Sequence, residues 1–188
     1  MEEIKQYFEQ LVGISASDWD VFSSQLKKVE YPKKAKLLKV GQTEQHLSFI
    51  EKGSARLFFP GEENDVTFWF CFQNEFVSAY DSFIQQLPSS YQIETMSPAI
   101  LWQITYEGLQ TVYKTTEIGN TIGRLVAENL YLMKAGREHS LLRETAEERY
   151  LALFKKYPHF LQEIPLKHLA SYIGVTPQAL SRIRKRIS

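Results

Sequence analysis

Side chains that could recognise DNA bases are concentrated near the end of the chain. Gln178 carries an amide suited to paired hydrogen bonds with adenine, and Arg182 carries a guanidinium suited to the O6 and N7 atoms of guanine. Ser181 and the methyl group of Ala179 could add smaller base contacts. The residues that would instead meet phosphates are Lys167, Thr176, Arg184, Lys185 and Arg186. Phosphate contacts of this kind predict DNA binding that weakens as the salt concentration rises.

The charge of the chain is unevenly distributed, although its formal net charge is zero. Residues 164–188 contain five lysines and arginines and no acidic residue, whereas residues 1–113 contain 9 basic and 15 acidic residues. An acid-free basic segment is typical of a surface that meets a polyanion. A solvated basic tail would explain the charge of this segment, but it would not explain the apolar pattern in the same residues.

That apolar pattern predicts a helix-turn-helix over residues 166–185. Ala170 is small where two helices would cross, and Gly174 can adopt the left-handed turn between them. Thr176 is a good N-cap, and Pro177 suits the first position of a helix. The shared core would be formed by Leu169, Ile173, Val175, Leu180 and Ile183. A helical hairpin in some other small α domain is the alternative interpretation.

We assign residues 142–188 to a DNA-binding domain that contains this helix-turn-helix. The domain would begin with a helix over residues 143–157, which Pro158 would end. Residues 159–164 could supply one short strand before the helix-turn-helix.

A long helix is predicted over residues 114–141, because its apolar residues alternate steps of four and three as in a coiled coil. The seam consists of Ile118, Ile122, Leu125, Asn129 and Leu132. Two copies of the helix meeting along this seam would form a homodimer, in which Asn129 would fix the register. The helix could instead pack on its own β domain, through a second apolar stripe that contains Val126, Leu130 and Met133.

Residues 1–113 are expected to form a β-rich sensor domain that begins with two helices. Ile4 and Phe8 have helical spacing, and Ser17 is a candidate cap for the second helix. Residues 29–104 fall into short segments rich in Val, Phe, Tyr, Trp and Thr, separated by glycines and prolines. Asn64 and Asp65 mark a hairpin turn. The pattern predicts a sandwich or roll of antiparallel strands.

The order of these parts along the chain, and three motifs within the sensor domain, resemble those of the cyclic-AMP receptor protein family, the CRP/FNR regulators. Residues 37–41 and 47–53 resemble the paired glycine turns of that family, and Asn74, Glu75 and Phe76 resemble the Gly-Glu-Leu that opens its phosphate-binding cassette. The resemblance covers nearly the whole chain and implies an α+β fold: a cyclic-nucleotide-binding-like jelly roll, a dimerisation helix and a helix-turn-helix. Its partners would be double-stranded DNA and a second copy of the chain, with RNA polymerase as a further candidate. Because Ser188 follows the last helix, we expect the fold to lack the final wing.

The ligand site implied by the resemblance departs from that of cyclic-nucleotide binders. Ser89 and Ser90 stand where the family has an arginine and a small hydroxyl residue, and residues 57–113 contain no Lys, Arg or His. A buried phosphate needs a cation or aligned N–H donors, and the cation would have to come from a residue such as Arg56 or Arg124. The candidate pocket residues are Asn74, Glu75, Phe76, Ser89, Ser90 and Arg124. We expect no cofactor, with a cyclic nucleotide as the less favoured alternative.

Other classes of protein find little support in the composition. The four histidines are scattered, and the single cysteine, Cys71, cannot hold an iron-sulfur cluster or form an intrachain disulfide. We therefore expect neither a metal site nor an enzyme. No segment has the pattern of a secretory signal or a membrane span, so we expect a cytoplasmic protein. The alternative function is a ligand sensor or protein-interaction module that has lost specific DNA binding.

Overall fold

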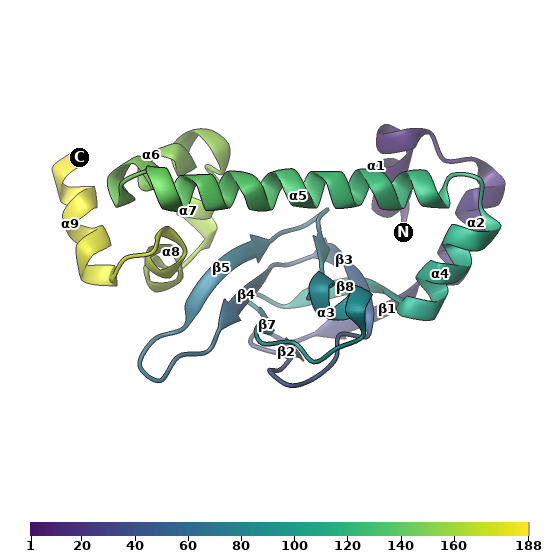
Figure 1. Ribbon diagram of the computed structural model, residues 1–188, viewed down its shortest axis with the longest axis horizontal. Helices are drawn as coiled ribbons and strands as arrows, with labels where there is room; N and C mark the ends of the chain where they lie inside the picture. Colours follow the sequence, from purple (N-terminus) through teal and green to yellow (C-terminus); the bar gives the residue numbers. More distant parts are fainter. Residues whose placement is uncertain (188) are drawn as a thin grey trace. The chain divides into compact units, whose positions relative to one another are not determined.

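The computed structural model describes residues 1–187, and the chain forms two compact units (Figure 1). Unit 1 comprises residues 1–58 and 70–127, and unit 2 comprises residues 59–69 and 128–188. The strand-rich part of the chain therefore lies in unit 1, whereas the C-terminal helices lie in unit 2.

Unit 1 begins with two short helices, as the sequence predicts. Helix α1 spans Glu2–Val12 and buries Ile4 and Phe8. Helix α2 spans Ala16–Ser24, and its cap is Ser15, whose hydroxyl accepts the Asp18 N–H at 3.1 Å. The predicted cap, Ser17, is wrong by two residues, because the helix has already begun at Ala16.

The strands form two antiparallel sheets among the described residues. One sheet has the order β1-β8-β3-β6, and the other has the order β2-β7-β4-β5. The strand bounds are β1 Lys27–Tyr31, β2 Lys36–Leu38, β3 His46–Lys52, β4 Ala55–Phe59, β5 Val66–Cys71, β6 Phe76–Val77, β7 Gln92–Thr95 and β8 Ala99–Thr105. The predicted hairpin at Asn64 and Asp65 is confirmed, since both residues lie between β4 and β5. The jelly-roll connection stays a prediction.

Aromatic and aliphatic side chains from the helices and the first sheet share one core in unit 1. The Phe49 ring centroid lies 6.2 Å from that of Tyr7 and 5.2 Å from that of Phe76. Two further helices border this region: α3 spans Tyr80–Gln85, and α4 spans Tyr106–Thr115. Because large rings fill the core from several elements, unit 1 has the buried apolar area that a stable domain needs.

Helix α5 spans Gly119–Arg143 and is the long helix that the sequence predicts over residues 114–141 (Figure 1). It begins five residues later than predicted, because residues up to Thr115 belong to α4. None of the helices in the described part of the chain is long and apolar enough to cross a membrane.

Unit 2 contains four further helices within the described residues. Their bounds are α6 Ala146–Lys156, α7 Phe160–Glu163, α8 Leu166–Ile173 and α9 Pro177–Ile187. The helix predicted over 143–157 begins later, because Thr145 and Glu148 form a capping box that starts α6 at Ala146. The short strand predicted over 159–164 is wrong, since most of these residues form α7. The predicted absence of a wing concerns the chain beyond the end of α9, outside the described residues.

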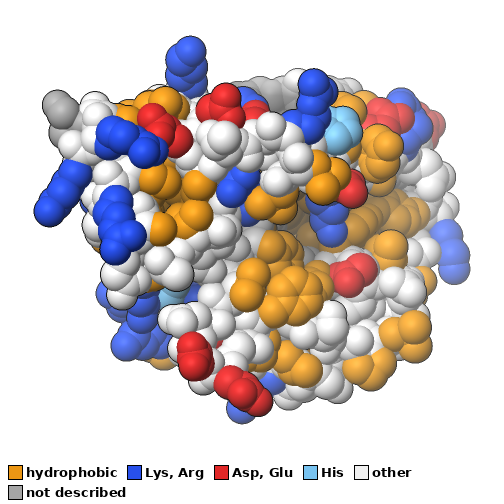
Figure 2. Space-filling model, turned by 60° about the vertical axis from the view of Figure 1, so that its left-hand side comes forward, with side chains coloured by type: hydrophobic (Ala, Val, Ile, Leu, Met, Phe, Trp, Pro, Cys, Tyr) orange, Lys and Arg blue, Asp and Glu red, His pale blue; other side chains and the backbone are white. Residues whose placement is uncertain are grey.

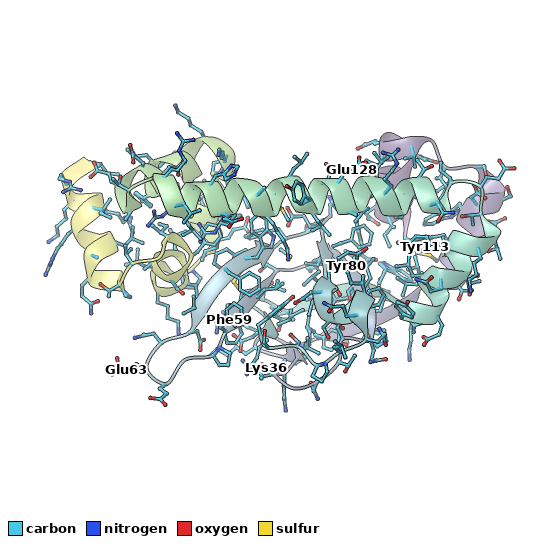
Figure 3. The ribbon with its side chains drawn as sticks, viewed as in Figure 1. Lys36, Phe59, Glu63, Tyr80, Tyr113 and Glu128 are labelled. Carbon is cyan, nitrogen blue, oxygen red and sulfur yellow. The ribbon has the colours of Figure 1, made fainter. Side chains whose placement is uncertain are left out.

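The tip of the β4–β5 hairpin also belongs to unit 2. Glu63 lies in this tip (Figure 3). The hydroxyl of Ser171, on α8, accepts the Thr67 N–H and donates to the Asp65 carbonyl, both at 2.8 Å. Trp69 packs edge-on against Tyr172, with ring centroids 6.3 Å apart. The hairpin tip is therefore held on α8 by both polar and aromatic contacts.

Candidate nucleic-acid interface

Helices α8 and α9 are joined by a tight turn that local chemistry specifies. Gly174 has a φ of 84°, in the left-handed region that favours glycine. The Val175 N–H donates to the Ala170 carbonyl at 3.0 Å, which ends α8. The hydroxyl of Thr176 accepts the Ala179 N–H at 3.2 Å and so caps α9. The predicted roles of Gly174 and Thr176 are confirmed.

The two helices, here called the α8–α9 pair, pack through a small apolar core. Ala170 and Leu180 are fully buried, and Leu169 and Ile173 are nearly so. Ala170 is small enough to let the helices approach, as the sequence analysis predicts. Val175 and Ile183 are only half-buried, so they lie at the edge of this core. A packed pair holds the outward side of α9 in one orientation.

The outward side of α9 carries the predicted base-reading residues. Gln178 and Arg182 are exposed, whereas Ala179 and Ser181 are half-buried. In Figure 2, lysine and arginine side chains gather on the surface toward the viewer's left, where α9 lies. All five predicted phosphate contacts are exposed: Lys167, Thr176, Arg184, Lys185 and Arg186. Arg186 forms an ion pair with Glu147 of α6, so an acidic residue from another helix partly neutralises this surface.

Two arginines outside the predicted site residues hydrogen-bond to the end of α8. Arg149 Nε donates to the Ile173 carbonyl at 2.8 Å, and Arg137 donates to the Tyr172 carbonyl. The Arg137 guanidinium lies 3.9 Å from the centre of the Tyr172 ring, and burial lowers its pKa. Cations are favoured where helical carbonyls lack partners. The sequence carries little signal for these contacts, because Arg149 and Ile173 are 24 residues apart.

In unit 1, the six candidate pocket residues have varied surroundings. Asn74 takes a left-handed turn with φ 67°, and the Glu75 carboxylate accepts the Phe72 N–H at 2.9 Å. Phe76 packs in the aromatic core, where it lines a void of only about 20 Å³. The remaining three are Ser89, which is buried, and Ser90 and Arg124, which are exposed.

The segment that resembles the start of the cassette leads from a strand into a short helix. Phe76 lies in β6, and the short helix α3 opens only after Ala79. The hydroxyl of Ser89 donates to the Tyr91 carbonyl at 3.0 Å and accepts the Tyr91 N–H at 3.2 Å. This serine shapes a turn, which differs from the ligand contact that the resemblance implies.

Glu44, which is not among the predicted site residues, is a buried acidic residue of this region. Its two oxygens accept the His46 N–H at 3.1 Å and the Ala79 N–H at 3.2 Å. Its own N–H donates to the Ser82 hydroxyl at 3.0 Å. Burial raises the pKa of the Glu44 carboxyl above its ordinary value of 4.5, although the backbone donors act in the opposite direction. The Ala79 N–H, at the start of α3, therefore already has an acceptor in the Glu44 carboxylate.

A cavity of about 300 Å³ opens beside Glu44 in unit 1. Among the described residues that line it, none is a lysine or an arginine: Tyr31, Leu37, Leu38, Gln42, Thr43, Glu44, Gln45, His46, Ser48, Val77, Ile93 and Gln103. Burial, and secondly Lys27, lower the pKa of His46 in this wall. The cationic candidate Arg56 forms an ion pair with Glu94 at 3.1 Å. The cavity therefore has an acidic and polar lining, which disfavours a phosphate.

Residues 1–187 contain no cluster of three or more His, Cys, Asp or Glu side chains that could hold a metal ion. The buried thiol of Cys71 has a pKa raised well above its ordinary value by burial and by Glu75. A thiol in this state is a weak nucleophile and a poor metal ligand.

The predicted dimer seam on α5 is divided between two environments. Ile122 is buried in the core of unit 1, and Ile118 packs against that core. Leu132 remains 66% exposed, and Asn129 is also exposed. The prediction of a continuous seam therefore needs correction at Ile122, whose surface is already covered by its own chain. Leu125 is half-buried, so the part of the predicted seam that the chain itself leaves uncovered begins at this residue.

Comparison with solved structures identifies the fold. The regulator CLP of Xanthomonas campestris has a TM-score of 0.67 and 18% identity, with 92% of this chain and 91% of that one covered. A CRP/FNR-family regulator from Eubacterium rectale has a TM-score of 0.73 and 13% identity, with coverage of 97% and 87%. The chain has the CRP/FNR fold. The catabolite activator protein of Thermus thermophilus shares this fold, with a TM-score of 0.58, 17% identity, and coverage of 94% and 85%. No family profile and no curated protein matches the sequence.

Proposed function

We propose that this protein is a homodimeric transcription regulator of the CRP/FNR type, which binds specific DNA sequences through α9. The observation that carries this proposal is the exposed side of α9. It presents Gln178 and Arg182 on a helix that a packed partner and a capped turn hold in place. A recognition helix needs this combination of rigidity and outward polar groups.

The proposed contacts divide into two kinds. Gln178 and Arg182 read bases in the major groove, with smaller contributions from Ala179 and Ser181. The basic and hydroxyl residues around them contact phosphates and set the position of the helix on the duplex. Arg137 and Arg149 act indirectly, because they brace α8 and touch no base in this arrangement.

A second copy of the chain would supply the second recognition helix. Exposed apolar side chains on α5 support this, since Tyr131 and Leu132 are 71% and 66% exposed. Exposed apolar surface commonly marks an interface, and Leu132 belongs to the predicted seam. In such a dimer the two α9 helices would enter successive major grooves roughly 34 Å apart, on a near-palindromic site.

The proposed regulator does not respond to cyclic AMP. Glu44 accepts the Ala79 N–H beside α3, and Ser89 is engaged in a turn. A cyclic phosphate placed there would lack a cation and would face a buried carboxyl group. A different effector, or constitutive DNA binding, fits these surroundings better.

The experiment that tests the proposal is selection of bound sequences from random duplex DNA at near-physiological salt. We expect a near-palindromic site, bound equally well with and without cyclic AMP. The substitution Arg182→Ala removes one bidentate base contact from each half-site, about 1 to 3 kcal/mol apiece, and should therefore weaken binding to that site by about thirtyfold or more.

The matched control is Arg143→Ala, which removes the same charge from the exposed end of α5. It should leave the preferred sequence unchanged. If no sequence is enriched by the folded dimer, the proposal is wrong and the alternative of a sensor without specific DNA binding is favoured. A response to cyclic AMP would refute the effector argument alone.

A further inference from the structure

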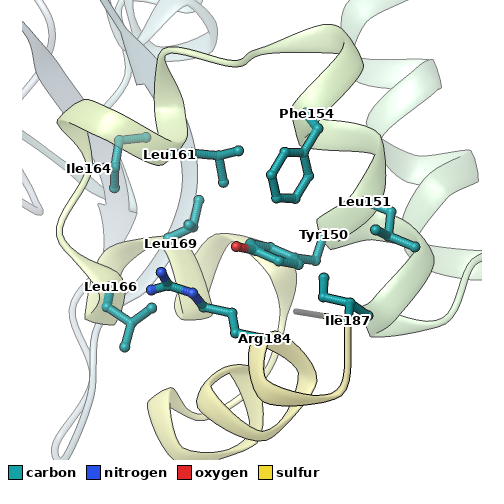
Figure 4. A pocket seen from close by; sticks show the side chains of 9 residues that line it. All are labelled: Tyr150, Leu151, Phe154, Leu161, Ile164, Leu166, Leu169, Arg184 and Ile187. Carbon is teal, nitrogen blue, oxygen red and sulfur yellow. The ribbon is translucent and has the colours of Figure 1, made fainter.

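Two cavities in unit 2 differ in the charge of their linings. The larger, of about 540 Å³, lies among α6, α7, α8 and α9 (Figure 4). Most of its wall is hydrocarbon, and it is lined by Tyr150, Leu151, Phe154, Leu161, Ile164, Leu166, Leu169, Arg184 and Ile187. The smaller, of about 310 Å³, lies among α6, α8 and the unit 2 part of α5. Its described lining includes three cationic side chains, those of Arg137, Arg149 and Lys156, so it has the stronger charge with which to select a ligand.

The two arginines lie at the buried end of the smaller cavity. Tyr172 and Ile173, which end α8, are only 4% and 1% exposed. Arg137, from α5, donates to the Tyr172 carbonyl, and Arg149 Nε, from α6, donates to the Ile173 carbonyl at 2.8 Å. Lys156, in the last turn of α6, is exposed. The cavity therefore has two cations in its depth and a third on its open side.

The charge of these three cations is not neutralised by the chain itself. Within residues 1–187, none of the three forms an ion pair with a carboxylate, and no Asp or Glu is among the described lining residues. The Glu144 carboxylate accepts from the Ser140 hydroxyl, whereas Arg149 donates to the Glu144 carbonyl. Positive charges that share a partly buried cavity favour an anion between them, because their repulsion grows where water is excluded.

Both guanidiniums also keep N–H donors for a ligand. Each guanidinium has five N–H groups. In the described part of the chain, Arg137 uses one of them and Arg149 uses two. The Nε atom of Arg137 is buried and has no hydrogen-bond partner among the described residues. A buried donor of this kind costs stability until an acceptor is supplied, so the chain alone satisfies this guanidinium incompletely.

The two guanidiniums are close enough for their charges to interact. Burial lowers the pKa of Arg137, and the positive charge of Arg149 lowers it further, although Tyr172 acts in the opposite direction. The Arg137 guanidinium lies 3.9 Å from the centre of the Tyr172 ring, which helps to hold it in this place. A dianion that accepts hydrogen bonds from both guanidiniums would offset their repulsion.

We infer that the smaller cavity binds a phosphate monoester with a small apolar body. The phosphoryl group accepts from Arg137 and Arg149, and Lys156 adds a third positive charge. A phosphate concentrates two charges at one point, which suits neighbouring guanidiniums better than two separated carboxylates do. The body of the ligand lies against the apolar part of the wall, formed by Leu132, Met133, Ala152 and Ile173. The volume is at the lower end of the range for small-molecule sites, about 300 to 1,000 Å³.

The test is titration of the whole protein with phenyl phosphate at about pH 8, where the phosphate is a dianion. Calorimetry measures the affinity, and NMR locates the site. We expect shifts of the methyl signals of Met133, Ala152 and Ile173 and of the Nε–H signals of Arg137 and Arg149. Phenyl sulfate has the same shape with one negative charge less and should bind about tenfold more weakly. Succinate, whose two charges are separated, should also bind more weakly than phenyl phosphate.

Two variants test the cations at the two ends of the cavity. Lys156→Gln leaves the contacts at the end of α8 in place and should weaken phenyl phosphate by about three- to tenfold. Lys155→Gln is its matched control, because Lys155 is also exposed but is not among the described lining residues, and it should change the affinity less than twofold. Arg137→Lys keeps the charge but loses the planar fork and should weaken binding by about tenfold. If that variant does not fold, the lysine pair still decides.

The inference is overturned if phenyl sulfate or succinate binds as tightly as phenyl phosphate, or if Lys156→Gln behaves as Lys155→Gln does. It is also overturned if the shifted signals belong to α9, because the phosphate would then have bound the basic surface of Arg184, Lys185 and Arg186. These outcomes leave the DNA proposal untouched, because they concern only the cavity. Conversely, failure of the chain to select a DNA sequence would leave phosphate binding in the cavity as a separate finding.

Discussion

Polar groups are placed in opposite ways in two regions of the chain. One is the α3 corner of unit 1, where Glu44 contacts Ala79 and Ser82 at the start of α3. The other is the α8–α9 pair of unit 2. At the α3 corner, the Glu44 carboxylate turns inward and accepts the N–H groups of His46 and Ala79. On α9, the polar groups of Gln178 and Arg182 turn toward solvent. An inward polar group satisfied by the chain stabilises the fold, whereas an outward group on a rigid helix is available to a partner.

The same contrast holds for charge. The cavity beside Glu44 has neither a lysine nor an arginine among its described lining residues, whereas α9 ends in Arg184, Lys185 and Arg186. A phosphate would be disfavoured at the first surface and attracted to the second. The likeness of fold therefore does not specify which surface attracts an anion. The charged residues of each surface decide that.

The largest effect on stability is expected at the α3 corner. Glu44→Ala removes both carboxylate oxygens and leaves two N–H groups without their acceptor. We expect the free energy of unfolding to fall by about 2 to 4 kcal/mol. Denaturant titration measures this, and Glu30→Ala, at an exposed position on β1, is the control. If both variants are equally stable, the Glu44 carboxylate is not a structural group.

A second prediction concerns how the stability of the natural protein and of Glu44→Gln depends on pH. The pKa of Glu44 is raised by burial, so between pH 4.5 and its folded-state pKa the folded chain binds more protons than the unfolded one. Ionisation of this group therefore costs stability as the pH rises through that window. The natural protein should lose stability relative to Glu44→Gln over this range. A constant difference across it would show that Glu44 titrates normally.

A smaller effect is expected where the hairpin tip contacts α8. Ser171→Ala removes the acceptor of the buried Thr67 N–H and the donor to Asp65. We expect a loss of about 1 to 3 kcal/mol and faster hydrogen exchange at the Thr67 amide. Ser181→Ala makes the same change on the outward side of α9. It should leave the stability within about 0.5 kcal/mol, and the reverse ranking would refute this assignment.

The smallest effects on stability are expected for two glycine substitutions, one destabilising and the other stabilising. Gly174→Ala forces a side chain into φ 84°, although its Cβ would meet only ordinary van der Waals contacts with Arg149 and Leu141, and should destabilise the protein by about 1 to 2 kcal/mol. Gly136→Ala, inside α5 with nothing within 4 Å, should stabilise the helix by about 1 kcal/mol. Thermal unfolding measures both. If Gly136→Ala destabilises only the dimer, Gly136 lies at a close approach between two copies.

Contacts between neighbours along the chain could be predicted from the sequence. The left-handed turn at Gly174 and the cap at Thr176 each depend on residues within about one helical turn. The outward direction of Gln178 and Arg182 then results from helical geometry. The fold class could also be predicted, because strands and helices repeat their apolar residues with different periods.

Contacts between distant residues were decided only by the tertiary structure. Glu44 meets Ala79 across 35 residues, Arg149 meets Ile173 across 24, and Ser171 meets Asp65 across 106. Ile122 looked like part of a dimer seam, but unit 1 covers it. The apolar spacing of one helix specifies which side is buried and leaves open what buries it, because the partner is chosen by packing. The sequence by itself therefore determined the α8–α9 pair and its outward residues, whereas tertiary packing decided the arginine contacts at the end of α8 and the closed α3 corner.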